Sequence, residues 1–457
     1  MKKMENEILE PKKSKLGIIF GGNRGIWLII VALFMYSVLS VYSASVQLPG
    51  TNTTQHLFKH VFGLLIGAVC IYLIHKIPSK YFRKVSFLLY WVSVILLIVT
   101  WFFAPEVNGA KRWLFIGPIT VQTSDFAKVA LLMYLANKLS KKEGEITTIG
   151  EFAKSILLPI FITCFLIMPS NLSTSLLVLL EAMVLLFFSS IKRSYFWGLT
   201  TIFLVSGGLL FAVIFYGNIQ IWRFPTWKAR VESWVDGNPS KEDQVQVNNA
   251  RMAVASGGIL GRGPGNGHAK VKLANAHCDY IFANIAEETG LVGSILLIWL
   301  YIMLFTRAIS IVKKLNKLSN SDGELEPKYK FRQYLVLGLT SMIVIQAFSN
   351  MAVSTDLMPV TGQTLPFVSY GNSSLVFMGF ALGVILSVSR EVEDDKAPIA
   401  KETEADGDIS LVADGSVAEE TDAAAEVTAD STDVKGEEVL EMIDDNELNN
   451  VEENERK

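Results

Sequence analysis

Two residues of opposite charge stand three positions apart in the apolar stretch at about 124–140. Asp125 and Lys128 would share one helical face, because residues three apart in an α-helix are neighbours. A charge held within a bilayer costs about 2.5–3.5 kcal/mol on insertion scales, so an ionisable pair in a membrane span is a functional candidate by default. The simpler alternative is that Asp125, in the N-terminal turn, completes a helix cap and Lys128 merely pairs with it.

A second group of acids follows a glycine-rich stretch. Asp279 stands at the start of an apolar run, next to His277 and Cys278, and Glu287 and Glu288 follow two turns later. A carboxylate at the boundary between water and lipid is placed to act as a general base on a lipid-borne substrate, although an ordinary helix start explains it too. The two Glu residues indicate an internal polar network or a cavity in a helix bundle.

Other chemistries find less support in the sequence. The stretch 257–267 holds six glycines, whose backbone amides could cradle a phosphate, but a plain flexible turn explains them equally well and the nucleotide-binding P-loop pattern is absent. His277 and Cys278 do not predict a zinc site, because no second pair with ligand spacing lies nearby. No nucleophile-elbow motif predicts a catalytic serine.

The composition indicates that the chain is a membrane protein, since 51% of its 457 residues are hydrophobic and the mean hydropathy is +0.37. Its membrane spans must therefore position these residues. A helix needs roughly 20 apolar residues to cross about 30 Å of hydrocarbon. Lipid cannot satisfy exposed backbone groups, and a barrel strand has only about 9–11 residues. The sequence therefore predicts an all-α polytopic membrane protein with about ten transmembrane helices, near 25–46, 57–75, 83–103, 124–140, 150–169, 173–190, 195–216, 281–306, 331–353 and 371–390.

The distribution of Lys and Arg predicts the orientation. These residues gather in the N-terminal segment and in alternate loops, which the positive-inside rule assigns to the cytoplasm. The loops at 47–56, 170–172 and 354–370 contain none and would face outward, so both termini lie inside. Two outward loops are nevertheless basic: the third, with Lys111 and Arg112, and the large extracytoplasmic loop 217–280 between spans 7 and 8. This outer surface could bind an anionic ligand.

The two ends of the chain differ from the membrane domain at 25–390. Residues 1–24 form a basic segment that we expect in the cytoplasm. Residues 391–457 carry 24 acidic and 5 basic side chains and no aromatic ones, so this tail cannot bury enough surface to offset the entropy of ordering. We expect a disordered cytoplasmic tail that keeps the protein soluble or acts as a spacer. The alternative is that the tail binds a basic cytosolic partner.

Three blocks together resemble the SEDS family of polytopic cell-wall polymerases: GAKRWLFIGPITVQTSDFAK, the stretch from SGGILGRGPGN to CDYIFANIAEETGLVGS, and MPVTGQTLPFVSYGNSSL. The likeness covers residues 20–390 and is greater to the division-type than to the elongation-type members. It implies a ten-span enzyme of the cytoplasmic (inner) membrane that polymerises lipid II into peptidoglycan strands on the outer face. It also implies a septal location, a class B penicillin-binding transpeptidase and division proteins as partners, and no nucleic acid.

The resemblance also implies roles for single residues. Asp279 matches the family's catalytic aspartate, and Lys128 matches a lysine thought to pair with it. Asp125 takes the place of a family glutamate and is, with Asp279 and Lys128, a catalytic candidate. Glu288 matches a family glutamate and is a candidate for binding the substrate. Other departures are Thr123 for Pro, Tyr280 for Phe, Asn372 for Gly and, before the glycine-rich loop, Asn249 for Gln.

The expected mechanism has Asp279, held by Lys128, remove a proton from the 4-hydroxyl of an acceptor sugar. That oxygen attacks the anomeric carbon of the donor, and the lipid diphosphate leaves with inversion. Cations would stabilise the leaving group, with a divalent ion such as Mg²⁺ or Mn²⁺ left open. The candidate cations are Lys111, Arg112, Arg251, Arg262 and Lys270.

Two rival functions remain open at this point. A transporter or lipid flippase would use Asp125, Lys128, Glu287 and Glu288 to line a translocation path, although the sequence shows no obvious inverted repeat. A non-catalytic scaffold for division proteins is the other.

Overall fold

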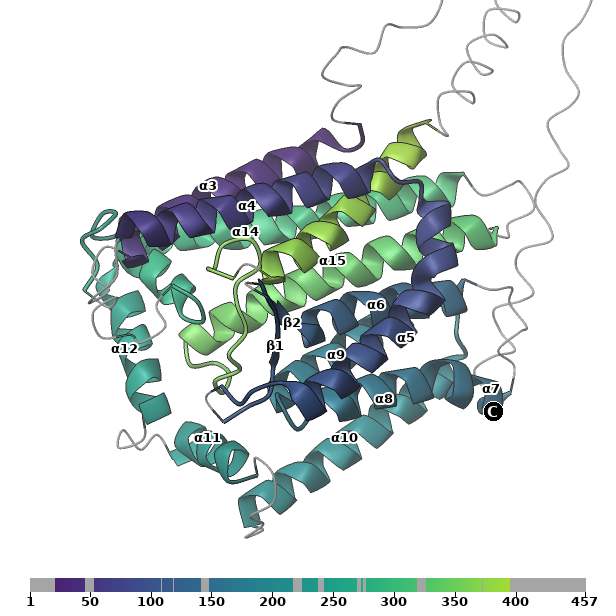
Figure 1. Ribbon diagram of the computed structural model, residues 1–457, viewed down its shortest axis with the longest axis horizontal. Helices are drawn as coiled ribbons and strands as arrows, with labels where there is room; N and C mark the ends of the chain where they lie inside the picture. The colour runs from purple at the N-terminus through teal and green to yellow at the C-terminus, as the bar shows by residue number, and fades with distance from the viewer. Residues whose placement is uncertain are drawn as a thin grey trace, which may run out of the picture. The chain divides into compact units, whose positions relative to one another are not determined.

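The computed structural model describes residues 21–45, 53–107, 109–117, 119–140, 148–216, 224–236, 242–268, 273, 277–318, 326–371 and 373–394. All of them belong to one compact unit, Met1–Lys396. Figure 1 draws these residues as a coloured ribbon. The second unit, Ala397–Lys457, and the predicted cytoplasmic segment up to residue 20 lie outside the described residues.

Every predicted span corresponds to a helix. The helices are α3 (Arg24–Ser45), α4 (Thr53–His75), α5 (Ser79–Phe103), α6 (Thr123–Leu139), α7 (Ile149–Phe152) continued by a π-helical turn η1 (Ala153–Leu157) into α8 (Leu158–Ile167), α9 (Leu172–Phe187), α10 (Arg193–Tyr216), α14 (Ile281–Lys317), α15 (Pro327–Ser354) and an unlabelled helix Ser373–Asp394. By length and composition, eight of the helices in the described part of the chain could cross a membrane. At 17 and 16 residues, α6 and α9 are shorter than the roughly 20 residues of a typical crossing.

Short elements that the sequence did not predict join these helices. Between α5 and α6, strands β1 (Trp113–Ile116) and β2 (Ile119–Gln122) form an antiparallel hairpin in which Trp113 pairs with Gln122. The strands are too short for period-2 alternation to be recognised in the sequence. The loop 217–280 contains α11 (Phe224–Asp236) and α12 (Glu242–Ser256). We call the end of the bundle with β1, β2 and the first turns of α6 and α9 the hairpin end.

The core of the bundle is α15, which packs on α14, α6 and α9 (Figure 1). Its buried face includes the amides Gln346 and Asn350, four residues apart. In contrast, α4, α5 and α10 expose large apolar side chains such as Phe58, Leu88 and Leu209, as helices facing lipid do. The interior can therefore hold polar groups in fixed positions while the apolar exterior faces lipid.

At the opposite end of the bundle, the last helix runs four residues into the predicted tail. Glu391 forms an ion pair with Arg332 at 2.6 Å and accepts a hydrogen bond from the backbone N–H of Ser79 at 2.8 Å. These contacts stabilise the additional helical turn, so this helix ends at Asp394, beyond the span predicted to end at residue 390.

Candidate functional site

Asp279 lies in the turn that precedes α14, at the hairpin end. Its side chain is partly exposed, and its backbone carbonyl accepts a hydrogen bond from Asn350 Nδ2 at 2.8 Å. None of the described residues donates a hydrogen bond to its carboxylate. The carboxylate is therefore held by its backbone while its oxygens are left available to a ligand.

Two arginines face this carboxylate. Burial raises the pKa of Asp279 above its ordinary value, while the charges of Arg112 and, less strongly, Arg230 pull the pKa back down. Arg112 Nη1 and Asp279 Oδ2 both lie 3.8 Å from the place where a Cβ on Gly362 would stand. Arg230 also donates to the carbonyl of Val360 at 3.3 Å. A carboxylate with a raised pKa is a stronger base than a solvated one. Arg230 was not among the candidates from the sequence.

Amide side chains hold the loop 355–371 against the Asp279 turn. Asn350 donates to the carbonyl of Gln363 at 2.7 Å as well as to Asp279, and Gln363 donates to Thr174 Oγ1 at 2.7 Å. Gln346 donates to the carbonyl of Thr364 at 3.0 Å. Sequence reasoning missed these residues because it considered only charged groups, although two amides four residues apart in an apolar span were a usable signal.

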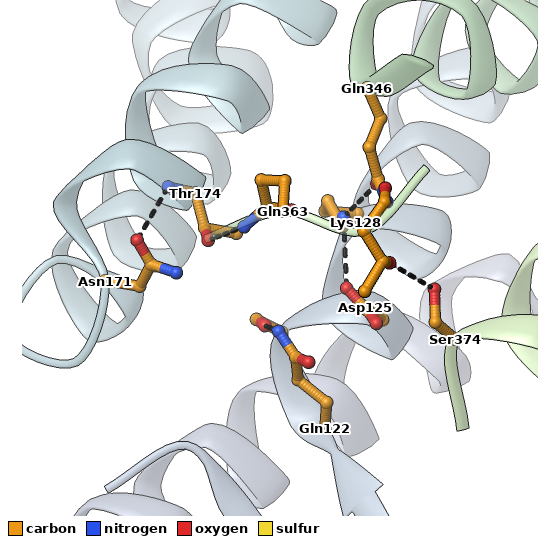
Figure 2. Close-up of polar contacts among 10 residues, drawn as sticks. Gln122, Asp125, Lys128, Asn171, Thr174, Gln346, Gln363 and Ser374 are labelled. Atoms are coloured by element: carbon orange, nitrogen blue, oxygen red, sulfur yellow. Dashed lines mark hydrogen bonds and ion pairs between the residues drawn. The ribbon is translucent and has the colours of Figure 1, made fainter. Parts of the chain in front are cut away.

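Lys128 pairs with Asp125 and not with Asp279. Its ammonium lies 3.0 Å from Asp125 Oδ1 and donates to Gln346 Oε1 at 2.7 Å, and both charged side chains are almost fully buried (Figure 2). The expected pairing with Asp279 is wrong, because the neighbouring acid on the same helical face and an amide from α15 already bind the ammonium. Through Gln346 and Thr364, Lys128 acts on the loop that covers the Asp279 turn.

Glu287 and Glu288 bind the glycine-rich loop. Glu287 Oε1 accepts hydrogen bonds from the backbone of His268 at 2.8 Å and from Ser256 Oγ at 3.3 Å, and Arg262 Nη1 lies 3.7 Å away. Glu288 accepts a hydrogen bond from Ser43 Oγ on α3. Both acids therefore belong to an internal polar network, as the sequence indicated.

The glycines allow the loop 257–268 to enter a break in α14. Gly290 has φ +66 inside α14, and the N–H groups of Arg262 and Gly263 donate to the carbonyls of Glu287 and Glu288 at 3.0 and 2.9 Å. A Cβ on Gly261, whose φ is +79, would stand 2.2 Å from the Glu288 carbonyl oxygen. These loop amides bond within the chain, so the structure gives no support to the phosphate-cradle interpretation.

The five predicted cations do not converge on one place. Arg251 is exposed and pairs with Asp356 at 3.1 Å, and Arg262 lies beside Glu287. Lys111 and Arg112 line a cavity of about 410 Å³ at the hairpin end. Lys270 lies outside the described residues. Among the predicted cations that the structure describes, Lys111 and Arg112 share this cavity, and Arg112 is the one that faces Asp279.

The residues around His277 form an aromatic cluster. Tyr370 stacks on His56 with ring centroids 4.3 Å apart and lies edge-on to His277 at 5.7 Å. Burial, with His56 nearby, lowers the pKa of His277 to about 4, so its imidazole is neutral at pH 7. The Cys278 thiol donates to the Tyr370 carbonyl at 3.5 Å.

Fold and site together define a polytopic helical membrane protein with a buried ion pair in its bundle and a carboxylate facing arginines at one end. The model of the cell cycle protein family FtsW/RodA/SpoVE matches residues 24–394, and the chain belongs to this family.

Among relatives with the name probable peptidoglycan glycosyltransferase FtsW, the chain is 30% identical to that of Hahella chejuensis over 383 residues, which are 81% of this chain and 92% of the relative. For Coxiella burnetii the identity is 29% over 379 residues, or 80% and 96%. A solved chain from a peptidoglycan synthase complex aligns with a TM-score of 0.65, 24% identity and coverage of 81% and 98%. Rod shape determining protein RodA of Thermus thermophilus aligns with a TM-score of 0.56, 23% identity and coverage of 81% and 97%; both share the fold.

Proposed function

We propose that this protein is a peptidoglycan glycosyltransferase of the division type, which polymerises lipid II into glycan strands at the septum. The observation that carries the proposal is Asp279, a carboxylate that faces Arg112 and Arg230 and has no hydrogen-bond donor among the described residues. The activity and division role in the names of the FtsW relatives support it.

In this mechanism Asp279 takes the proton from the acceptor hydroxyl as the oxygen attacks the anomeric carbon of the donor. A glycosidic C–O bond forms and the bond between the anomeric carbon and the diphosphate oxygen breaks, with inversion. Arg112 stabilises the departing diphosphate, and the proton on Asp279 returns to solvent. Asn350 and Lys128 are positioning residues, since they hold the backbone of the Asp279 turn and the loop above it.

The proposal requires the hairpin end to face outward from the cytoplasmic membrane. The charge distribution of the loops supports this orientation. One relative of known structure belongs to a complex that coordinates polymerisation and crosslinking, which supports a crosslinking transpeptidase of the class B penicillin-binding type as the partner.

The dependence on a divalent cation stays a prediction. The described residues contain no group of three or more His, Cys, Asp or Glu side chains that could hold a metal ion, so no step above is assigned to one. Titrating Mg²⁺ or Mn²⁺ into the polymerisation assay after chelation would measure this dependence.

The test is polymerisation of lipid II by the purified full chain in nanodiscs, with and without the cognate transpeptidase, followed by glycan length. Asp279→Asn should lower the rate by about 10²–10⁴-fold. Polymerisation by this variant at the wild-type rate would exclude Asp279 as the base. If the protein instead moved fluorescent lipid II across vesicles without lengthening any glycan, the flippase alternative would replace the proposal; growth supported by Asp279→Asn would favour the scaffold.

A further inference from the structure

Glu181, in the middle of α9, is a buried acid that the mechanism above does not use. Its side chain is 1% exposed, and neither of its carboxyl oxygens receives a hydrogen bond from the residues that the structure describes. Buried polar groups are almost always hydrogen-bonded, so this exception requires an explanation. A substrate can reach Asp279, which is partly exposed, but the bundle encloses Glu181. A partner for Glu181 must therefore come from the bundle itself.

The packing of three helices brings Glu181 to the same depth as Lys128. Leu185 of α9 and Leu132 of α6 both lie against α15: a Cβ on Gly338 would stand 3.4 Å from Leu185 Cδ2 and 3.8 Å from Leu132 Cβ. Helices α6 and α9 both begin at the hairpin end, so Lys128 and Glu181 lie one turn closer to that end than these leucines. Helical side chains lean toward the N-terminus of their helix, so both of these lean the same way.

The Lys128 ammonium is the cation nearest to hand for Glu181. Lys128 attracts the Glu181 carboxyl group and Asp125 repels it. An ammonium has three N–H donors, and Lys128 directs two of them at Asp125, 3.0 Å away, and Gln346, 2.7 Å away (Figure 2). The third N–H finds no acceptor among the described residues. A donor without an acceptor and a carboxyl group without a donor thus lie on neighbouring helices at one depth.

The three charged groups can be arranged in two ways that have the same net charge. In this structure Asp125 is ionised, because the ammonium bonds to it. Glu181 is the neutral acid, because an ionised carboxylate without a donor is costly in an apolar interior. In the other arrangement Glu181 gives up its proton, Asp125 takes one up, and the ammonium moves to Glu181. One ammonium, one carboxylate and one carboxylic acid are present in both.

The choice of partner affects Gln346, which links the ammonium to the loop 355–371. Gln346 Oε1 accepts the hydrogen bond from Lys128, and Nε2 donates to the carbonyl of Thr364 at 3.0 Å. Gln346 is buried, so an ammonium that moves to Glu181 leaves Oε1 without a donor in the interior. The side-chain amide then loses the contact that orients it toward Thr364.

We propose that Glu181 is the second partner of Lys128 and, through Gln346, a positioning residue for the loop 355–371. With Lys128 on Asp125 the loop is held over the Asp279 turn, and with Lys128 on Glu181 the loop is released there. The inference rests on the proposed function in one respect, which is that Asp279 is the base that this loop covers. The change of partner itself can be measured without any polymerisation assay.

Hydrogen exchange of the full chain in nanodiscs tests the change of partner with acid-to-amide variants, which keep the side-chain shape and fix the position of the anion. Glu181→Gln confines the ammonium to Asp125, so the amides at 363–365 should exchange more slowly than in the wild type. Asp125→Asn sends the ammonium to Glu181, and the same amides should exchange about 10-fold faster, as expected for one lost hydrogen bond. Glu287→Gln is the matched control: it alters a buried acid that binds His268, so exchange at 363–365 should not change.

Melting temperatures separate a second partner from a merely structural acid. Lys128 keeps an anion in either single variant, so both should melt close to the wild type. Asp125→Asn/Glu181→Gln leaves the ammonium with no anion and should melt far lower. If Asp125→Asn alone melts as low as the double variant, Glu181 is not a partner of Lys128. Exchange at 363–365 that moves in the same direction in both single variants also overturns the inference.

These measurements and the polymerisation assay can fail independently. Opposite shifts in hydrogen exchange, in a protein that does not polymerise lipid II, would retain the change of partner and overturn the proposed function. Unchanged hydrogen exchange in both single variants of an active polymerase would overturn the role of Glu181 and retain the proposed function.

Discussion

Asp279 and the pair Glu287–Glu288 are two helical turns apart in sequence, yet the structure treats these carboxylates in opposite ways. Glu287 receives hydrogen bonds from His268 and Ser256, and Glu288 receives one from Ser43. Asp279 receives none at its carboxylate from the described residues and faces two arginines. Carboxylates surrounded by donors stabilise a loop, whereas the carboxylate without them is available to a substrate.

The comparison extends to a fourth carboxylate. Asp125 is buried and paired with Lys128, which also binds Gln346, so it resembles the Glu pair more than Asp279. The alternative raised from the sequence agrees with this geometry in part: Asp125 lies in the first turn of α6 and Lys128 pairs with it, but no side chain caps the helix. Ionisable residues within spans are functional candidates, but their partners decide whether that function is chemistry or positioning.

Lys128→Met gives the largest stability change expected from this comparison. The substitution leaves Asp125 buried without its cation, which should lower the free energy of unfolding by about 3–5 kcal/mol. Thermal unfolding of the purified protein in detergent measures this, and the double variant Asp125→Leu/Lys128→Met should recover most of the loss. If Lys128→Met instead unfolds like the wild type but polymerises lipid II slowly, Lys128 takes part in the reaction itself.

Gly261→Ala tests the contact between the glycine-rich loop and α14. The added Cβ meets the Glu288 carbonyl at 2.2 Å in a backbone with φ +79, so we expect a loss of about 3 kcal/mol. Gly258→Ala is the matched control, because Gly258 also has positive φ, +56, but nothing lies within 4 Å of its Cβ position. It should cost only about 1 kcal/mol. Equal losses would mean that the loop does not pack into the break in α14.

The pH dependence of polymerisation distinguishes the two arginines. Activity requires ionised Asp279 and is lost as the pH falls through its pKa. Since Arg112 and Arg230 lower the pKa of Asp279, Arg112→Gln and Arg230→Gln should each move the acid limb to higher pH, with the larger shift for Arg112. Acid limbs that do not move would show that Asp279 is not the titrating base, whatever the loss of rate.

The spans were predictable from sequence because apolar length is a local property. Residues 281–306 and 331–353, for example, fall within α14 and α15. The four-residue strands before α6 were not predictable, because strands of that length carry too little periodicity. Helices α11 and α12 were missed too, because they lie in a polar loop where no apolar run marks them.

The candidate site was predictable in its charged residues but not in their partners. Asp279, Lys111 and Arg112 were identified from type and position, whereas the role of Arg230 depends on a long loop returning to the Asp279 turn. The partner of Lys128 depends on how α6 packs against α15, which the sequence of either helix does not specify.

The most direct test compares Asp279→Asn with Glu287→Gln for polymerisation rate per folded molecule and for melting temperature. Asp279→Asn should lower the polymerisation rate by about 10²–10⁴-fold. It should melt at or above the wild-type temperature, because burial raises the pKa of Asp279 and its ionised carboxylate therefore destabilises the folded protein at pH values above that pKa. Glu287→Gln should melt lower and keep its rate per folded molecule, since its donors lose a charged acceptor. The opposite pattern, with activity lost at Glu287 and retained at Asp279, would contradict the account.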